Sequence, residues 1–169
     1  DWHAALEALR HQQRTRTDPA MDDLHTLADG SISEARAVQG TLARQFFDPN
    51  DIRNNPAMGG GALYDLGSYI ISACGVVFGR APLRVVAAID RDPSFGIDRL
   101  TTALLDYGGR HATFTVGTQS GPPEATHQQF SVLGTNGWLR FDFPYAHMRS
   151  RDCHIFVGDS SSMGSFETS

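Results

Sequence analysis

Two side chains that can move a proton, Asp65 and Tyr69, lie four residues apart in a segment with the apolar pattern of a helix. Residues four apart on a helix share a face, one turn from each other. A phenol is protonated at neutral pH, so it can donate a proton to a carbonyl oxygen, or accept one from an alcohol when a nearby cation stabilises the phenolate. The spacing therefore allows an acid/base pair. It equally allows a surface tyrosine beside a carboxylate that interacts with the helix dipole.

The basic residues exclude several other chemistries, because all 14 of them are arginine and none is lysine. This chain therefore supplies no Schiff-base lysine, no lysine of a phosphate-binding loop and no ammonium group that could tune the Tyr69 phenol. The 19 acidic residues give a net charge of -5, and the arginines form no cluster. Phosphate binding needs clustered cations, so we expect no nucleic-acid partner.

Metal and membrane sites are not predicted either. The seven histidines have none of the spacings typical of metal sites, and Cys74 and Cys153 form no disulfide framework, which fits a reducing compartment. The apolar run from Tyr69 to Phe78 is shorter than the roughly 18 residues of a membrane span. We expect no metal, no membrane and a cytoplasmic location. A periplasmic location stays open, because the chain begins at an aspartate and a signal peptide cannot be judged.

Three consecutive glycines, Gly59–Gly61, precede the predicted helix and invite comparison with the dinucleotide fingerprint. Gly59 and Gly61 fit the first two positions of G-x-G-x-x-G, but Tyr64 occupies the third, and the residues from Arg53 to Met58 do not have the pattern of a strand. We therefore reject a dinucleotide cradle. Glycines at a helix start still let a ligand approach the backbone, where free N–H groups favour an anionic or hydroxylated group. A flexible helix start is the alternative.

The helices that position these residues follow from apolar spacing and capping residues. The helix with Asp65 and Tyr69 is predicted over residues 62–77 and ends at Gly79, a typical C-cap. Two further helices are predicted near the start of the chain, over residues 2–13 and 18–29.

The strands are predicted mainly after this helix, where the apolar period changes to two. Gly108–Gly109 and Asn136–Gly137 are turn dipeptides between alternating segments, so each predicts a hairpin. Helices and strands in separate blocks indicate an α+β fold with a mostly antiparallel sheet. The predicted strands cover residues 34–46, 83–89, 100–107, 112–118, 130–133, 138–143 and 154–157.

The second face of this sheet carries several apolar residues, although an exposed face is expected to be polar. An antiparallel sheet normally exposes one polar face, so a partner is expected to cover the apolar positions. We expect that partner to be a second copy, which gives a homodimer through the open sheet face. The apolar residues on out-of-phase positions are Val86, Ala88, Ala103, Leu105, Tyr107, Leu133 and Trp138.

Three segments of the chain resemble the Gfo/Idh/MocA oxidoreductases. Residues 52–69, I-R-N-N-P-A-M-G-G-G-A-L-Y-D-L-G-S-Y, resemble the family's helix-start motif G-G-G-x-x-x-D-x-G-x-[HY]. Residues 29–40, D-G-S-I-S-E-A-R-A-V-Q-G, resemble its G-x-I-G-x-[VI]-R-x-V segment, and residues 132–139, V-L-G-T-N-G-W-L, resemble its V-x-G-T-x-G hairpin. The segments follow the family's order, so the resemblance extends over most of the chain, from about residue 19 to 168.

The resemblance implies that this chain is the C-terminal α+β domain, an open, mostly antiparallel sheet with helices packed on one face. It also implies a longer protein whose N-terminal nucleotide-binding domain is absent. Tyr69 stands where many members have histidine. A tyrosine there resembles the branch of glucose–fructose oxidoreductase, dihydrodiol dehydrogenase and NADP xylose dehydrogenase, in which it is the catalytic acid/base. The family's Glu-Lys-Pro motif and nucleotide fingerprint would precede this chain. The implied site residues are Asp65 and Tyr69 as catalytic groups and Arg53, Asn54, Gly60 and Gly61 as substrate-binding groups.

The function that the resemblance implies is hydride transfer between NAD or NADP and a sugar or cyclic polyol. Tyr69 relays the proton, Asp65 orients the substrate or Tyr69, and the cofactor is bound mainly by the missing domain, so that this chain alone is inactive. The alternative is a non-catalytic sugar-binding or dimerisation module. We expect residues 1–169 to form one substrate-binding and dimerisation domain, with residues 1–17 as a poorly packed remnant or linker.

Overall fold

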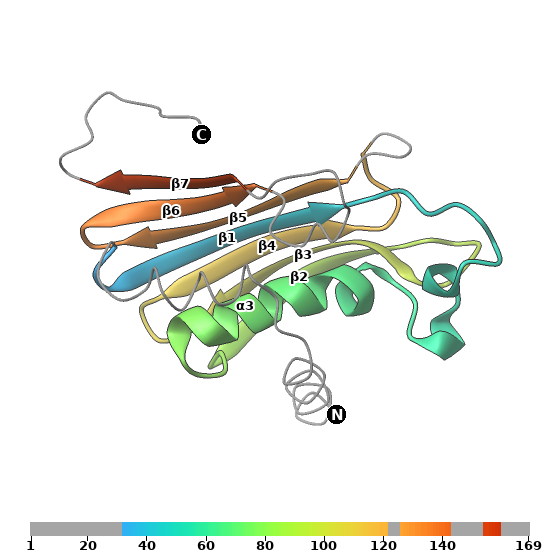
Figure 1. The fold of residues 1–169 in the computed structure, drawn as a ribbon. Coiled ribbons are helices and arrows are strands. Elements are labelled where there is room, and N and C mark those ends of the chain that lie inside the picture. Colours follow the sequence, from blue (N-terminus) through green and yellow to red (C-terminus); the bar gives the residue numbers. More distant parts are fainter. Residues whose placement is uncertain (1–31, 122–125, 143–153, 160–169) are drawn as a thin grey trace.

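The computed structural model describes residues 32–121, 126–142 and 154–159, and the structural statements below refer to these residues. They form an open seven-stranded sheet with one long helical stretch across a single face (Figure 1). The helical elements are two short 3-10 turns, η1 (Ile52–Asn54) and η2 (Pro56–Met58), a π turn, η3 (Leu63–Gly67), and α3 (Ser68–Phe78). The strands are β1 (Ala35–Ala43), β2 (Arg84–Arg91), β3 (Asp98–Asp106), β4 (His111–Gly117), β5 (His127–Gly134), β6 (Gly137–Asp142) and β7 (His154–Asp159).

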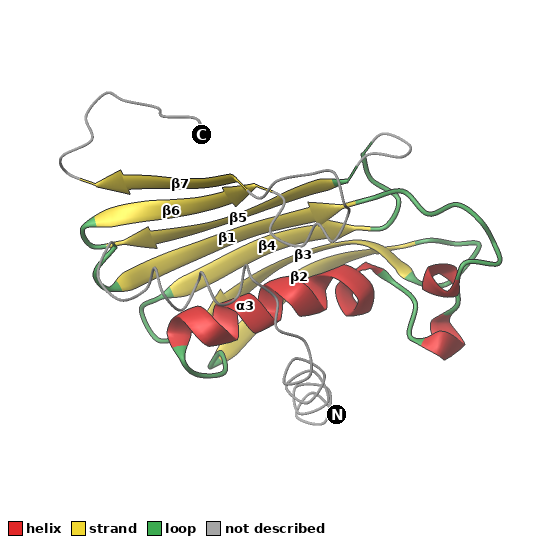
Figure 2. Cartoon of the chain, in the orientation of Figure 1, coloured by secondary structure: helices red, strands yellow, loops and turns green. Residues whose placement is uncertain are grey.

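The sheet is mixed but mostly antiparallel, with the strand order β2-β3-β4-β1-β5-β6-β7. Only the β1–β4 pair is parallel among these described strands, and every other neighbouring pair is antiparallel. The first strand therefore inserts into the middle of the later meander, between β4 and β5 (Figure 2). The predicted α+β class and mostly antiparallel sheet are confirmed.

Glycine chemistry at the turns explains the hairpins. Gly108 and Gly109 have φ values of 80° and 85°, and Tyr107 donates its N–H to the carbonyl of Arg110 across them. Positive φ at both central residues is the requirement of the two-residue turn whose twist matches the strands. The predicted hairpins β3–β4 and β5–β6 and the final strand are confirmed; Phe143, placed in the second hairpin, lies outside the described residues.

The π turn η3 and α3 form one helical stretch from Leu63 to Phe78, which confirms the predicted helix. It ends where expected: Gly79 has a φ of 65° and donates its N–H to the carbonyl of Gly75 at 2.9 Å. Apolar periodicity did not indicate the π turn. Such turns widen a helix locally and occur often at functional sites, and this one contains Asp65.

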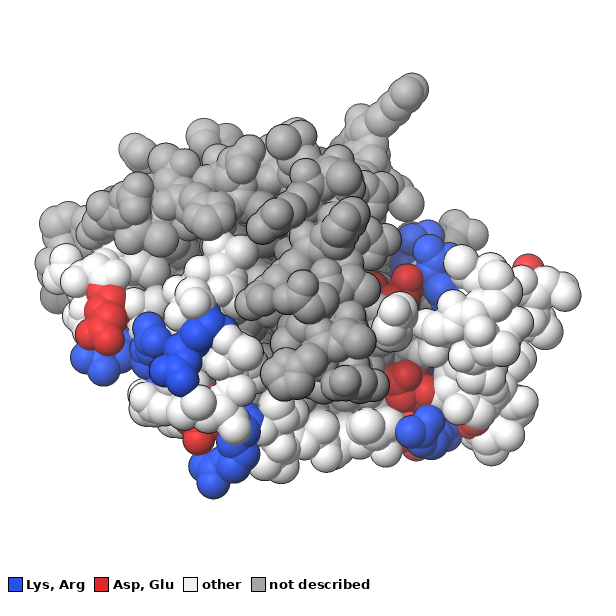
Figure 3. Space-filling model, turned by 90° about the horizontal axis from the view of Figure 1, so that it is seen from below, with Lys and Arg blue, Asp and Glu red and all other residues white. Residues whose placement is uncertain are grey.

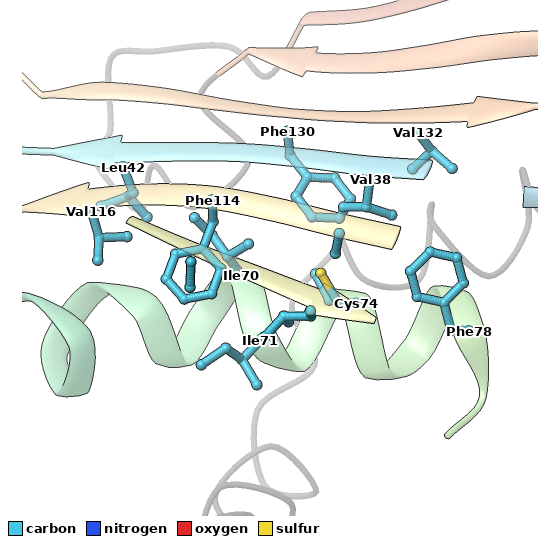
Figure 4. Close-up of a cluster of buried hydrophobic side chains, with 14 of the residues drawn as sticks. Val38, Leu42, Ile70, Ile71, Cys74, Phe78, Phe114, Val116, Phe130 and Val132 are labelled. Atoms are coloured by element: carbon cyan, nitrogen blue, oxygen red, sulfur yellow. The ribbon is translucent and has the colours of Figure 1, made fainter. Parts of the chain in front are cut away.

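The core lies between this helical stretch and the middle strands of the sheet (Figure 4). Ile70 and Cys74 of α3 are fully buried, and they face buried side chains of the sheet such as Phe114. Burial raises the pKa of the Cys74 thiol to about 12, so this cysteine is a packing residue rather than a nucleophile. The sheet residues labelled in this core are Val38, Leu42, Phe114, Val116, Phe130 and Val132.

The prediction of which residues lie on which face of the sheet is partly wrong. Ala103, Leu105 and Tyr107, expected on the outer face, are 5%, 1% and 1% exposed and belong to the core. Strand pairing decides which face these side chains are on. Leu105 lies opposite Ala112 of β4, which is fully buried on the helix side, and directly opposite residues share a face. Three expected members of the outer face, Val86, Leu133 and Trp138, are exposed, and Ala88 pairs with the exposed Thr102 on the same side.

The strand predicted over residues 83–89 exists as β2, but its apolar alternation does not mark a buried face. Every residue of β2 is exposed, including Val85 and Ile89, which share a side with the core. The reason is position: β2 is the sheet edge, while the helix packs over β1 and β4.

The stretch Pro56–Phe78 is long and apolar enough by composition to span a membrane, with a mean hydropathy of 1.4 over its most apolar window. Half of that window is buried in this fold, as in a core helix. Gly59 and Gly61 interrupt the stretch with φ values of 77° and 121°, which no continuous helix contains. The predicted helices 2–13 and 18–29 and the predicted linker 1–17 lie outside the described residues.

A close approach of α3 to the sheet generates a stability prediction. A Cβ at Gly40 of β1 would lie 2.7 Å from Cγ2 of Ile70. In the full-length protein, Gly40→Ala is expected to lower the free energy of unfolding by about 1–3 kcal/mol through overpacking, measured by chemical denaturation. The control is Gly75→Ala in α3, where a Cβ meets no atom within 4 Å; equal stability of the two alanine variants would contradict the prediction.

Candidate functional site

The loop between β1 and the helical stretch is built from two short turns with side-chain caps. Asp51 accepts the N–H of Arg53 at 2.9 Å at the start of η1, and Asn55 accepts the N–H of Ala57 at 3.0 Å at the start of η2. Pro56 occupies the first position of η2, where its missing N–H costs nothing. The turn residues predicted to form a loop therefore give it one fixed backbone path.

The glycine run closes this loop on itself. Gly60 donates its N–H to the carbonyl of Asn55 at 2.9 Å, Gly61 donates to the carbonyl of Arg53 at 3.0 Å, and Gly59 bonds within the η2 turn. The expectation that these N–H groups are free for an anionic ligand is therefore wrong. Their donors are used inside the chain, which agrees with the rejection of a dinucleotide cradle.

Packing requires glycine at two of these positions. A Cβ at Gly60 would lie 2.5 Å from the carbonyl oxygen of Arg53. Gly61 is buried and has a φ of 121°, which side chains rarely allow. The glycine run thus serves a close backbone crossing in front of the helix.

The Asp65 carboxylate is held by Arg53 from this loop. Nε of Arg53 donates to Oδ2 of Asp65 at 3.0 Å, and Nη1 lies 3.3 Å from Oδ1 of Asp51. The guanidinium also stacks 4.5 Å from the ring centre of Phe46. Partial burial lowers the pKa of Arg53, but Asp65 and Asp51 raise it more, and the net pKa is above its usual value. The group is therefore always cationic and fixes the orientation of Asp65.

Tyr69 lies at the surface, one turn after Asp65. It is 41% exposed, whereas Ile70, the next residue, is fully buried. The Asp65 side chain is 29% exposed, so both groups lie away from the buried face of the helix. The structure thus brings Arg53 to Asp65 and leaves Tyr69 exposed one turn further along the same helix.

Two of the predicted substrate-binding residues lie beneath this surface. Asn54 is 3% exposed, and its amide donates to the carbonyls of Phe46 at 3.1 Å and Asp48 at 2.8 Å. Gly61 is buried as well. Their burial indicates that Asn54 and Gly61 support the loop, whereas Arg53 and Gly60 are partly exposed and remain open to contact.

Phe46 and Asp51 also belong to this site, although neither was predicted from the sequence. Asp51 could have been found, since an aspartate two residues before an N–H that needs a partner is a typical cap. Phe46 could not, because its stacking on Arg53 depends on how β1 ends next to the loop.

Charges of both signs occur on the helix side. Where the described residues are visible on that face, acidic and basic side chains lie beside each other (Figure 3). Within the described residues no group of three or more His, Cys, Asp or Glu could hold a metal ion. A polar hollow lies on the open side of the sheet, lined by Gln39, Gly40, Thr41, Thr102, Thr113, Phe114, Thr115 and Gln129.

Comparison with known proteins places the chain in one family. Residues 25–140 match the GFO/IDH/MocA C-terminal domain. An uncharacterized oxidoreductase of Rhizobium meliloti is 40% identical over 150 residues, which are 88% of this chain and 44% of that protein. The trans-1,2-dihydrobenzene-1,2-diol dehydrogenase of Homo sapiens is 31% identical over 104 residues, 60% of this chain and 30% of that enzyme.

A solved structure gives the same assignment. The 3-ketoreductase of Actinomadura kijaniata, crystallised with NADP and TDP-benzene, superposes with a TM-score of 0.63 and 25% identity, over 82% of this chain and 45% of that one. The chain thus spans less than half the length of each of these three proteins.

The buried amide of Asn54 generates a prediction for the loop. In the full-length protein, Asn54→Ala leaves the carbonyls of Phe46 and Asp48 without these donors and is expected to cost about 1–3 kcal/mol of unfolding free energy, measured by chemical denaturation. Asn50→Ala is the matched control, because the exposed Asn50 amide contacts only the nearby side chain of Asp48, and we expect a change within about 0.5 kcal/mol. A similar small effect at both positions would contradict the supporting role of Asn54.

Proposed function

The chain belongs to the Gfo/Idh/MocA family of oxidoreductases, and from that membership we propose that it is the substrate-binding half of a longer NAD- or NADP-dependent enzyme. The proposed reaction transfers hydride between the nicotinamide and a CH–OH carbon of a sugar or cyclic polyol. The names of the relatives support this class: one oxidises a cyclic diol, and another is a ketoreductase bound to NADP.

The observation that carries the proposal is the placement of the Tyr69 phenol at the surface, one turn beyond a fixed carboxylate. When an alcohol is oxidised, its hydroxyl proton must leave as the hydride leaves the carbon. The Tyr69 oxygen is the proposed acceptor of that proton, and in the reverse direction it is the donor to the carbonyl oxygen.

Asp65 and Arg53 are the proposed orienting groups. The carboxylate keeps one oxygen on Arg53, and its other oxygen is available to accept a hydrogen bond from a substrate hydroxyl or from Tyr69. Because Arg53 also bonds Asp51 and stacks on Phe46, the carboxylate is preorganised rather than mobile. Gly60 adds a surface without a side chain, where a substrate can approach the backbone.

The dinucleotide does not fit the glycine run of this chain. The N–H groups of Gly60 and Gly61 already donate to the carbonyls of Asn55 and Arg53 in the loop, so they are not available to bind a pyrophosphate. When bound, the nicotinamide supplies or accepts the hydride. We propose that the part of the longer protein outside this chain holds it, and that this chain contributes the wall of the site that carries Tyr69.

The test of this function is Tyr69→Phe in the full-length enzyme. The variant removes the hydroxyl and keeps the ring, so turnover should fall by about 10²–10⁴-fold, measured by nicotinamide absorbance with a panel of sugars and cyclic diols. Tyr64→Phe is the matched control, a 61% exposed tyrosine of the same helix, and its turnover should match the wild type. Unchanged turnover in Tyr69→Phe would refute the proposed role of Tyr69, whereas a wild-type protein that turns over no member of the panel would favour a non-catalytic sugar-binding or dimerisation module.

The open sheet face is the proposed homodimer surface. Apolar side chains on this face lie on both sides of the polar hollow, with Val86, Leu100 and Leu104 toward β2 and Leu133 and Trp138 toward β7. Apolar patches with a polar neighbourhood are typical of subunit contacts. A second copy stacked on this face would remove both apolar regions from water.

The oligomeric state tests this surface. Leu104→Arg, on the open face, should shift the full-length protein from dimer to monomer in sedimentation velocity, because two buried arginines per interface would be unpaired. Val85→Arg places the same charge on the opposite side of the sheet edge and should leave the dimer intact. Dimers of equal stability in both variants would exclude this face as the interface.

A further inference from the structure

We propose that Asp98, at the first residue of β3, is a positioning residue for the Asp65–Tyr69 face, because it caps the helix start from another part of the chain. This inference rests on the proposed function, since it assigns Asp98 a role in holding the proposed proton-transfer groups. Sequence analysis did not single out Asp98.

One carboxylate oxygen of Asp98 accepts two short hydrogen bonds. Oδ2 of Asp98 accepts the backbone N–H of Leu63 at 2.6 Å and the hydroxyl of Thr101 at 2.9 Å. Thr101 is fully buried, so the hydroxyl that orients the carboxylate is itself held inside the fold. The carboxylate therefore connects the first turn of the helix to the beginning of β3.

The helix cannot cap itself at this end. The residue in the N-cap position is Ala62, which has no side-chain acceptor. The first N–H groups of a helix lack partners within the helix, and a carboxylate is favoured there by both hydrogen bonding and the helix dipole. Asp98, 35 residues after Leu63, supplies the missing acceptor.

The absence of a side chain at Gly61 allows the same contact. A Cβ at this position would collide with Oδ1 of Asp98. The last glycine of the run therefore leaves room for the carboxylate to reach the helix. This contact gives the third glycine a purpose that neither a dinucleotide motif nor a flexible helix start explains.

The contact bears on the site through the π turn. Leu63 opens that turn, and Asp65 follows two residues later with its N–H bonded to the carbonyl of Gly61 at 3.1 Å. Without the Asp98 acceptor, fraying would begin at Leu63 and displace Asp65 first and Tyr69 one turn later. A displacement of about 1 Å of a catalytic group can cost about 10²-fold in rate.

The test uses the full-length enzyme and compares Asp98→Ala with Asp98→Asn. Asp98→Ala should lower kcat by about 10–100-fold with an unchanged KM for the nicotinamide cofactor, because the site is displaced but the cofactor is bound elsewhere. Asp98→Asn keeps an acceptor for the Leu63 N–H and should restore kcat to within a few-fold of wild type. Hydrogen exchange of the amides of residues 62–66 should be faster in Asp98→Ala than in wild type.

If Asp98→Ala does not fold, Thr101→Val, which removes the orienting hydroxyl, should give a smaller drop in kcat with the same acceleration of exchange.

The matched control is Asp92→Ala. Asp92 caps a turn in the same β2–β3 connection, accepting the N–H groups of Ser94 at 2.7 Å and Phe95 at 2.9 Å, without touching the helix. It should lower thermal stability but leave kcat unchanged. The inference is overturned if Asp98→Ala lowers stability with normal kcat, as Asp92→Ala does, or if exchange at residues 62–66 does not change. Unchanged turnover in Tyr69→Phe would instead refute the proposed reaction, while the exchange measurement still reports on the Asp98 contact.

Discussion

Arg53 ties the loop to the helix in two ways at once. Its backbone carbonyl accepts the N–H of Gly61, and its guanidinium bonds the carboxylate of Asp65. The first contact needs a residue without a side chain at Gly60, because a Cβ there would meet that carbonyl at 2.5 Å. The path of the backbone and the orientation of the acidic group are therefore set by one residue, and the glycine run follows from this geometry.

Apolar packing and polar contacts have different roles here. Burying an aliphatic side chain such as Ile70 contributes about 1.5–3 kcal/mol, whereas a partly exposed ion pair such as Arg53–Asp65 contributes about 0–1 kcal/mol. The sheet therefore holds the helix in place, and the polar contacts decide where its first turn points. Replacement of the polar groups should alter function more than the stability of the fold.

The exposed large apolar side chains form two groups. One lies on the open face around the polar hollow and along the edge strand β2, both sides of which contact water. The other lies in the loop before the helix and at the helix start, and it includes Phe47, Ile52, Met58 and Tyr64. Long exposed edges and apolar patches are disfavoured in isolated domains, because they promote association. This distribution agrees with a chain that spans less than half the length of the relatives it matches.

The sequence by itself determined the strands and the long helix, and it placed Asp65 and Tyr69 four residues apart on that helix, because helical and strand periods, glycine turns and residue spacing are local properties. It also indicated the family, through three short segments in order. Only the tertiary structure decided that β1 enters the meander beside β4 and that Asp98 caps the helix. It also decided that Leu105 is buried in the core, whereas every residue of β2 is exposed. These features depend on contacts between residues far apart in the chain, whose geometry no local pattern encodes.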